Sequence, residues 1–164
     1  MVLFFSSQES MLVPITGKGN YFRAWDFSEI NVGQVPWLII GDMNCIKNGK
    51  EKLGGREFNN SKASKDFNNF IKQNGFFEAS FTGAQYTWAN NRKRDACIQA
   101  RLDMAIYNEY WLNRNIIIKV KHLQRIKSDH RPILVSCEKE KGFKYKKSLL
   151  LLSISDLSKK VSKR

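Results

Sequence analysis

Hydrophobic residues recur at helical spacing in part of the chain. The pattern predicts three helices, near residues 21–30, 64–75 and 108–114. In the second of these, Phe67, Phe70 and Ile71 share one face. Ser64 is expected to cap its start, and Gly75 stands where a C′ glycine commonly ends a helix. This segment carries the clearest helical pattern in the sequence.

Other hydrophobic segments predict strands. Residues 35–40 form the run Val-Pro-Trp-Leu-Ile-Ile, followed by Gly41, which is typical of a buried strand. Further strands are expected over 77–81, 86–89, 98–106, 116–123 and 132–137. Residues 46–60 are polar and contain glycines, so they predict a loop. Because strands and helices mix without regular alternation, we expect a mostly antiparallel α/β (α+β) layered domain.

The pattern also suggests a domain organisation. Residues 1–20 have no clear period and are expected to form a poorly ordered N-terminus. Residues 21–138 contain the predicted helices and strands. Residues 139–164 lose the periodicity and gain positive charge, so they predict a basic, flexible tail.

The charge of the chain suggests a polyanionic partner. The net charge is +13, and basic side chains displace counterions from a phosphate backbone, so DNA or another nucleic acid is the expected partner. Much of the surplus lies in the tail, where residues from Lys141 onward include eight basic residues and one acidic residue. A solvated charge run without a partner remains the alternative for that segment.

The cysteines and the apolar clusters bear on the location of the protein. The three cysteines have no CxxC spacing. The apolar cluster at residues 1–5 is too short for a signal peptide, and the one at residues 149–152 is too short for a membrane span. We therefore expect an intracellular protein of the nucleus or cytoplasm that is neither secreted nor membrane-bound.

Asp42 and Asn44 directly follow the buried strand, in the sequence Gly-Asp-Met-Asn. Residues i and i+2 of a strand point to the same side, so a carboxylate and an amide would lie together. This pair suits phosphoryl chemistry, in which the carboxylate manages a proton or a metal ion and the amide holds a phosphate oxygen. The commoner interpretation is that both residues form a turn.

Two further motifs carry charged side chains. Arg101 and Asp103 lie two residues apart in a predicted strand, where an ion pair on the surface is the ordinary interpretation. Asp129 and His130 are adjacent in the turn before the last predicted strand, and such a pair is a candidate for acid–base work. Tyr86-Thr87-Trp88 is an aromatic strand segment, for which packing in the core is the default.

The order of these motifs adds information that none of them carries alone. The chain contains PWLIIGDMN, GFFEASFTGAQYTW, RLDMAI and HLQRIKSDHRPIL, in this order. From about Arg23 to Ser136 it resembles the endonuclease/exonuclease/phosphatase (DNase I-like) superfamily. It is most similar to the endonuclease domain of LINE-type, non-LTR retrotransposons, in particular those of plants. The resemblance implies a layered β-sandwich flanked by helices and a Mg²⁺-dependent phosphodiester hydrolase that acts on DNA.

The resemblance also implies roles for five residues. Asp42 would take part in activating the attacking water or protonating the leaving oxygen, and Asn44 would hydrogen-bond the scissile phosphate. His130 would contact the phosphate and share its charge or proton, and Asp103 would orient His130. Asp129 would lie beside the divalent ion.

The match covers only the C-terminal part of the family's domain. The family's first half carries a glutamate that is its main metal ligand, and the residues before Asp42 are too few for that half. Glu9 lies too close to Asp42 to match it well. We therefore expect a partial sandwich with strands for about one sheet, whose open apolar face a partner chain would cover, and impaired activity. A non-catalytic, basic nucleic-acid-binding remnant and a non-functional fragment are the alternatives.

Overall fold

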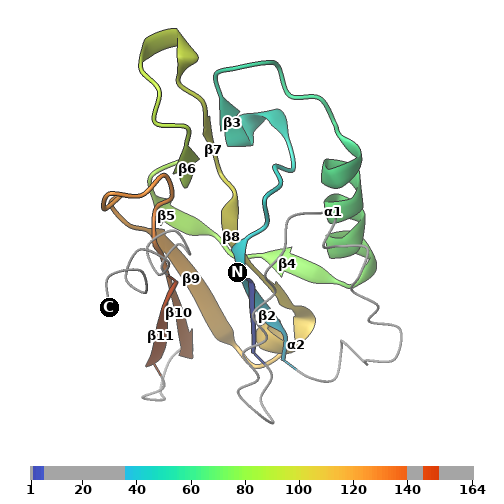
Figure 1. The fold of residues 1–164 in the computed structure, drawn as a ribbon. Helices are drawn as coiled ribbons and strands as arrows, with labels where there is room; N and C mark the ends of the chain where they lie inside the picture. Colours follow the sequence, from blue (N-terminus) through green and yellow to red (C-terminus); the bar gives the residue numbers. More distant parts are fainter. Residues whose placement is uncertain (1, 6–35, 140–145, 152–164) are drawn as a thin grey trace, which may run out of the picture.

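The computed structural model describes residues 2–5, 36–139 and 146–151, which form a mixed α/β structure (Figure 1). In this part of the chain, two four-stranded sheets and one three-stranded sheet are joined by two α-helices and short 3₁₀ turns. The predicted mixed, mostly antiparallel class is confirmed, since one strand pair is parallel and every other pair is antiparallel.

The first sheet has the strand order β1-β2-β8-β4. Its strands are β1 (Val2–Phe5), β2 (Leu38–Asp42), β8 (Asp103–Asn108) and β4 (Phe76–Glu78). Strand β8 lies in the middle of the sheet and pairs with both β2 and β4. Its pairing with β2 places Asp42 directly opposite Asp103 at one end of the two strands.

The second sheet has the strand order β11-β10-β9-β5. Its strands are β11 (Lys146–Leu151), β10 (Ile133–Lys139), β9 (Ile116–His122) and β5 (Phe81–Gly83). Strand β5 runs parallel to β9, which brings the backbone of Gly83 against that of His122. A Cβ atom on Gly83 would meet the His122 carbonyl oxygen at 2.4 Å, and its φ is +96°, so only glycine fits here without strain.

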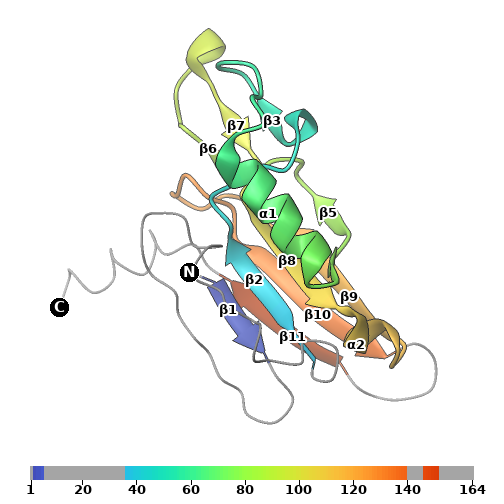
Figure 2. The same cartoon turned by 90° about the vertical axis from the view of Figure 1, so that its right-hand side faces the viewer.

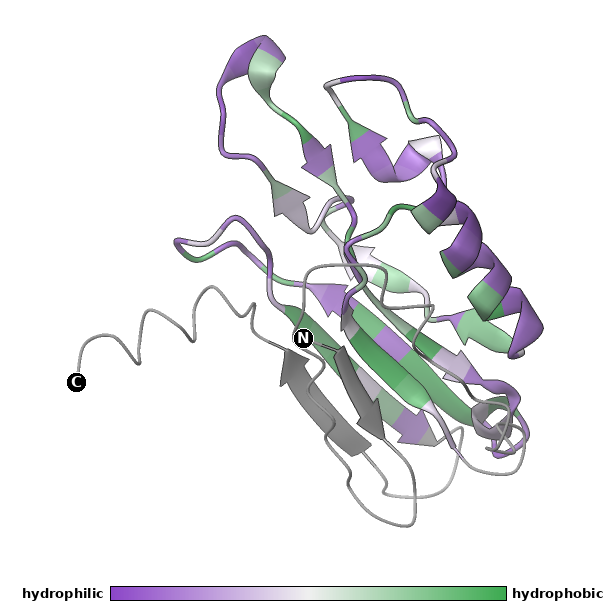
Figure 3. Ribbon diagram, turned by 45° about the vertical axis from the view of Figure 1, so that its right-hand side comes forward, coloured by the Kyte–Doolittle hydropathy of each residue, from purple (hydrophilic) through white to green (hydrophobic). Residues whose placement is uncertain are grey.

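A small third sheet extends away from the other two. It joins β3 (Lys52–Leu53), β7 (Gln99–Ala100) and β6 (Trp88–Ala89), and the 3₁₀ turns η2 (Gly49–Glu51) and η3 (Arg94–Ala96) lie in its connections. Hydrophilic residues predominate in this region, whereas the long strands β2, β8, β9 and β10 of the large sheets are mainly hydrophobic (Figure 3). The prediction of a loop over residues 46–60 was wrong in part, because this segment contains η2 and β3.

The two large sheets share one hydrophobic core. Leu38, Ile40 and Ala105 of the first sheet pack in the same cluster as residues of β9 and β10. The latter are Ile118, Val120, Ile133, Val135 and Cys137. The expectation of strands for about one sheet with an uncovered apolar face was therefore wrong. Each of these two sheets covers a face of the other through this cluster.

Helix α1 (Lys62–Gln73) covers the other face of the first sheet (Figure 2). Phe67 and Phe70 are buried against Ile39, Met104 and Ile106, which face outward from β2 and β8. The helix begins earlier than its hydrophobic pattern predicted. Ser61 is the N-cap, and its Oγ accepts a hydrogen bond from the backbone N–H of Ser64, which lies inside the first turn. Gly75 follows the C-cap with a φ of +61°, as expected.

Other boundaries follow the sequence pattern within a few residues. The short helix α2 (Glu109–Leu112) lies inside the predicted segment 108–114, and β9 and β10 match their predicted strands closely. The predicted strand over 98–106 is instead divided into β7 and β8.

Both ends of the chain contribute a strand. Strand β1 lies within the predicted N-terminal segment 1–20, and β11 lies within the predicted tail 139–164. The helix predicted over 21–30 falls outside the described residues. No helix in the described part of the chain is long and apolar enough to span a membrane.

Candidate active site

Two carboxylates meet at the end of the first sheet. Asp42 is the last residue of β2 and Asp103 the first of β8, and the strand register pairs them. Asp103 is buried, whereas Asp42 is partly exposed. A backbone hydrogen bond of 2.8 Å from Met43 N to the Leu102 carbonyl extends the pairing just beyond the strands. Like charges so close together favour a proton or a cation between them.

His130 approaches both carboxylates from the connection between β9 and β10. Its Nδ1 lies 2.9 Å from Asp103 Oδ2, and its Nε2 lies 4.0 Å from Asp42 Oδ2. Since an ionised carboxylate only accepts hydrogen bonds, Nδ1 carries a proton and donates it to Asp103. Nε2 is therefore directed toward Asp42. One water or substrate oxygen beside this pair, about 2.8 Å from each atom, would bridge Nε2 of His130 and Oδ2 of Asp42.

The pKa values of this group shift in ways that suit proton transfer. Burial raises the pKa of Asp42, and the Asp103 carboxylate raises it further, against the lowering effects of the Asn44 amide and His130. Burial alone would lower the pKa of His130. The hydrogen bond to Asp103 and the charges of Asp103, Asp42 and Asp129 outweigh burial, so the His130 pKa is raised. Both groups thus bind a proton more tightly than they would in water.

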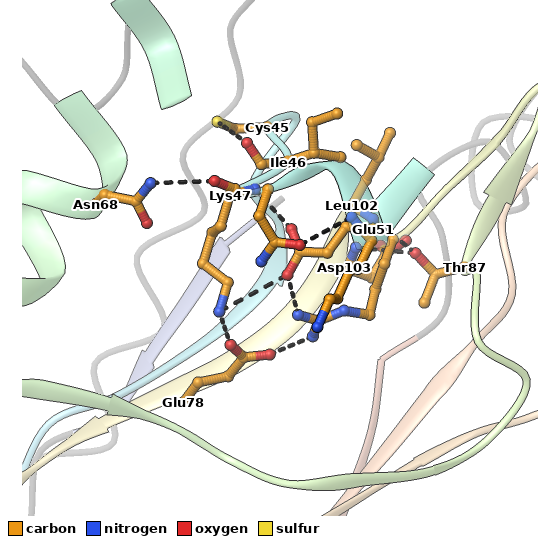
Figure 4. Close-up of polar contacts among 12 residues, drawn as sticks. Cys45, Ile46, Lys47, Glu51, Asn68, Glu78, Thr87, Leu102 and Asp103 are labelled. Atoms are coloured by element: carbon orange, nitrogen blue, oxygen red, sulfur yellow. Dashed lines mark hydrogen bonds and ion pairs between the residues drawn. The ribbon is translucent and has the colours of Figure 1, made fainter. Parts of the chain in front are cut away.

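Thr87 fixes the backbone that carries Asp103 (Figure 4). It is fully buried, and its Oγ1 accepts hydrogen bonds of 3.0 Å from the backbone N–H groups of both Leu102 and Asp103. The Thr87 carbonyl accepts a hydrogen bond of 2.7 Å from Arg131 N, next to His130. One residue therefore holds the two segments whose side chains pair at the site. The sequence pattern predicted only an aromatic strand segment that contains Thr87.

Asn44 lies beside the site in a different way than strand geometry predicted. The strand ends at Asp42, and Asn44 has a φ of +49°, so the expected i, i+2 alternation does not apply to it. Its backbone N–H donates a 2.8 Å hydrogen bond to Asp42 Oδ1, which forms a turn around the carboxylate. The Asn44 side chain is exposed, next to Asp42. The segment is both a turn and a place where a carboxylate and an amide adjoin.

Asp129 lies next to His130, but its side chain has another partner. Asp129 Oδ2 accepts a hydrogen bond of 3.3 Å from Trp88 Nε1, and its carbonyl accepts one of 3.0 Å from Ala89 N. These bonds attach the 128–130 segment to β6, where Trp88 and His130 also form an isolated β-bridge. Trp88 therefore has a polar contact at the site in addition to packing.

The donors fit a divalent cation only incompletely. Among the described residues, no group of three or more His, Cys, Asp or Glu side chains is arranged to hold a metal ion. Asp103 is engaged by His130, and Asp129 by Trp88. The carboxylates present do not complete a Mg²⁺ site by themselves.

Arg101 does not pair with Asp103, although their spacing predicted a surface ion pair. Both residues are buried, and Arg101 is ion-paired with Glu51 and Glu78. This expectation was wrong because β8 begins only at Asp103, so strand alternation does not relate the two side chains. No pattern in the sequence pointed to Glu51 or Glu78, which come from distant segments.

Comparisons of the chain with family models, with curated proteins and with solved structures found no match. The function of the site is therefore inferred from its geometry and from the motifs that carry the resemblance.

Proposed function

We propose that this chain is a portion of an endonuclease/exonuclease/phosphatase (DNase I-like) domain, similar to those of LINE-type retroelements, that hydrolyses phosphodiester bonds in DNA with impaired activity. One observation carries the proposal. Asp42, Asp103 and His130 come from three separate motifs, and the His130 ring lies 2.9 Å from Asp103 and 4.0 Å from Asp42, which is paired with Asp103 in the strand register. These are also the motifs on which the resemblance depends.

The resemblance implies the proposed roles, and the geometry of the site supports them. Asp103 holds His130 with Nδ1 protonated, so that Nε2 faces the substrate. In its protonated form, His130 donates a hydrogen bond to a phosphate oxygen and offsets its charge. Asn44 is exposed at the rim of the site, where its amide is available to the phosphate. Asp129 keeps the segment around His130 attached to β6.

Asp42 is the proposed proton-transfer group. In hydrolysis, the water oxygen forms a bond to phosphorus, the bond from phosphorus to the leaving oxygen breaks, and a proton moves from the water to the leaving oxygen. The ionised form of Asp42 accepts the water proton, and the raised pKa of this carboxyl group favours that acceptance. Asp42 then passes this proton to the leaving oxygen, whereas His130 keeps its own Nε2 proton as a donor to the phosphate oxygen.

Mg²⁺ is the cofactor that the resemblance implies, with Asp129 nearest to it. When bound, such an ion offsets the charge that develops on the phosphate. The incomplete donor set around Asp42 and Asp129 supports the proposal of impaired activity, because the two nearby carboxylates are few ligands for a hard cation.

The arrangement of the sheets is consistent with a partial DNase I-like sandwich. The two four-stranded sheets share a core, α1 covers the outer face of the first sheet, and the candidate site lies at the end of β2 and β8. These features support the finer fold proposal.

Exposed basic residues in two connections of the chain support DNA as the substrate. Arg92, Lys93 and Arg94 are exposed in the connection between β6 and β7, and Lys127 is exposed close to His130 in sequence. Arg125 joins the two connections through a hydrogen bond of 3.3 Å to Asn91 Oδ1. Positive charge beside a phosphodiester site strengthens binding to a polyanion. A DNA substrate also agrees with the proposed location in the nucleus or cytoplasm.

The test is nicking of supercoiled plasmid by the purified chain with Mg²⁺. The His130→Ala and Asp103→Asn variants, purified identically, are the matched controls, and EDTA removes the metal. We expect slow nicking that each variant and EDTA abolish. Nicking that persists in EDTA or in His130→Ala would overturn the proposal, provided that circular dichroism shows both proteins folded alike.

The second candidate function is nucleic-acid binding without catalysis. The exposed arginines and lysines between β6 and β7, together with the basic residues after Lys141, favour it. Binding would be insensitive to sequence and would weaken steeply with salt. It should also weaken when residues 152–164, which follow β11 and contain four basic residues, are deleted, and unchanged binding by the deleted form would contradict this alternative.

A further inference from the structure

A second group of charged side chains lies beside the candidate active site. Lys47, Glu51, Glu78 and Arg101 form this group, which we call the ion cluster (Figure 4). The side chains of Glu51 and Arg101 are almost fully buried, with 5% and 6% of their surface exposed. Lys47 and Glu78 are mostly buried, with 18% and 21% exposed. The cluster contains two positive and two negative groups, so it adds no net charge near the site.

Arg101 is the centre of the ion cluster. Its two terminal nitrogens pair with different carboxylates, one with Glu51 Oε1 and the other with Glu78 Oε1. Its guanidinium also lies over the ring of Phe81, 4.9 Å from the ring centre. Lys47 Nζ closes the cluster through Glu78 Oε2 and, at 3.7 Å, through Glu51 Oε1. A planar guanidinium held at three sides has little freedom to reorient.

The cluster connects the two segments that carry the site's carboxylates. Glu51 accepts a hydrogen bond from Lys47 N through its carboxylate, at 2.6 Å, and one from Arg101 N through its carbonyl, at 2.9 Å. Lys47 follows the Asp42–Asn44 turn, and Arg101 precedes Asp103 by two residues. Both segments are thus held to Glu51 immediately beyond the point where β2 and β8 diverge.

Burying four charges is a costly way to stabilise a fold. Desolvation offsets much of the attraction between buried ions, and well-packed apolar residues of similar size are often equally stabilising. Burial also lowers the pKa of Lys47, against the opposing effect of Glu51, so the lysine retains its charge less readily than in water. What ion pairs provide and apolar packing does not is a fixed relative position of the groups they join.

We propose that the ion cluster positions the candidate active site, with Glu51 and Arg101 as positioning residues for Asp42 and Asp103. It keeps the turn after β2 in register with the start of β8, so that both carboxylates face His130 at the same time. This inference rests on the proposed function for its catalytic consequence, whereas its structural consequence can be measured independently.

The experiment compares the full-length chain with a double variant, Glu51→Gln together with Arg101→Met. This change removes the three ion pairs that involve Glu51 or Arg101 and leaves Lys47 paired with Glu78, so no charged group of the cluster is left alone. The first readout is the pKa of His130 from ¹⁵N NMR titration of its ring. We expect the His130 pKa to fall toward its ordinary value of 6.5, because the carboxylates that raise it lose their fixed positions. The second readout is plasmid nicking, for which we expect kcat to fall by about 10- to 100-fold with little change in KM.

Lys119→Met is the matched control. Lys119 forms an exposed ion pair of 2.6 Å with Glu138 between β9 and β10, so its loss should change neither readout. Arg101→Lys keeps the charge but cannot engage two carboxylates with a planar fork, and we expect the same direction of change in a smaller amount. If the double variant does not fold, the His130 pKa of Arg101→Lys decides the question.

An unchanged His130 pKa in the folded double variant would overturn the inference and leave the cluster a purely stabilising feature. A wild-type chain that does not nick DNA would instead contradict the proposed function. In that case the NMR titration still tests whether the cluster positions the carboxylates around His130.

Discussion

Replacing Thr87 with valine removes one oxygen atom from the interior and preserves the shape of the side chain. That oxygen accepts hydrogen bonds from the backbone N–H groups of Leu102 and Asp103, with a nitrogen–oxygen distance of 3.0 Å in each. The Thr87 side chain is fully buried. In the variant, water has little access to the Asp103 amide, so this donor loses its only described partner. We therefore expect Thr87→Val to destabilise the chain more than its small change in volume suggests.

The magnitude follows from the two donors. An unsatisfied buried donor costs about 1–3 kcal/mol. The Leu102 amide is only part-buried and should cost less than the Asp103 amide. Together they predict a loss of about 2–4 kcal/mol. Thr87→Ser keeps the hydroxyl and removes one buried methyl group, for which about 1 kcal/mol is expected.

Urea unfolding followed by circular dichroism measures both variants. With a slope of about 2 kcal/mol per molar urea, a loss of 3 kcal/mol lowers the midpoint by about 1.5 M. The serine variant should lose about 0.5 M under the same conditions. If valine and serine lower the midpoint equally, the two hydrogen bonds to Thr87 Oγ1 do not contribute as described.

Three other predictions concern pH and the backbone. Asp103→Asn should lower the pKa of His130 in an NMR titration. A raised folded pKa stabilises the protein below the unfolded value of 6.5 and loses this effect as the pH rises through the folded pKa. The destabilisation by Asp103→Asn should therefore be larger at pH 6 than at pH 9, and an equal loss at both would contradict the pairing. Burial lowers the pKa of His122, despite its hydrogen bond to a backbone carbonyl, so protonation favours the unfolded chain and stability falls as the pH drops below 6.5. His122→Phe should lose less stability than the wild type between pH 7 and pH 5, and parallel losses would refute this reasoning. Gly83→Ala should cost about 2–4 kcal/mol by urea unfolding, because its Cβ meets a carbonyl oxygen at 2.4 Å. Gly75→Ala, with a similar positive φ but open space, should cost about 1 kcal/mol, so equal losses would count against the close contact.

Hydrophobic patterning predicted the elements in which one face is buried along the whole length and the opposite face is exposed. Strand β9 alternates between buried and exposed residues from Ile116 to His122, and a sequence window is enough to detect that period. Helix α1 was found for the same reason through Phe67 and Phe70. Its first turn was missed because capping is decided by backbone geometry at Ser61, and Ser64 has the same chemistry.

Contacts between distant segments were much harder to predict. Nothing near Glu51 in the sequence indicates that it meets Arg101, which lies 50 residues away. The second large sheet was missed as a cover for the first, because the pairing of β5 with β9 and of β10 with β11 depends on contacts that no local period records. The resemblance grouped Asp42, Asp103 and His130, and the structure places these three residues close together, whereas strand spacing misplaced Asn44.

The position of β8 in the first sheet has a consequence for how this chain folds. Strands β2 and β4 precede β8 in the sequence, but β8 separates them in space and forms hydrogen bonds with both. During synthesis, one edge of β2 can pair with β1 at once, but its other edge stays unpaired for about 60 further residues until β8 has been made. Folding dominated by such distant contacts is slow compared with that of helical proteins. The native NMR signal of the His130 ring depends on β2, on β8 and on the connection between β9 and β10. We expect this signal to be among the last native features to return on refolding.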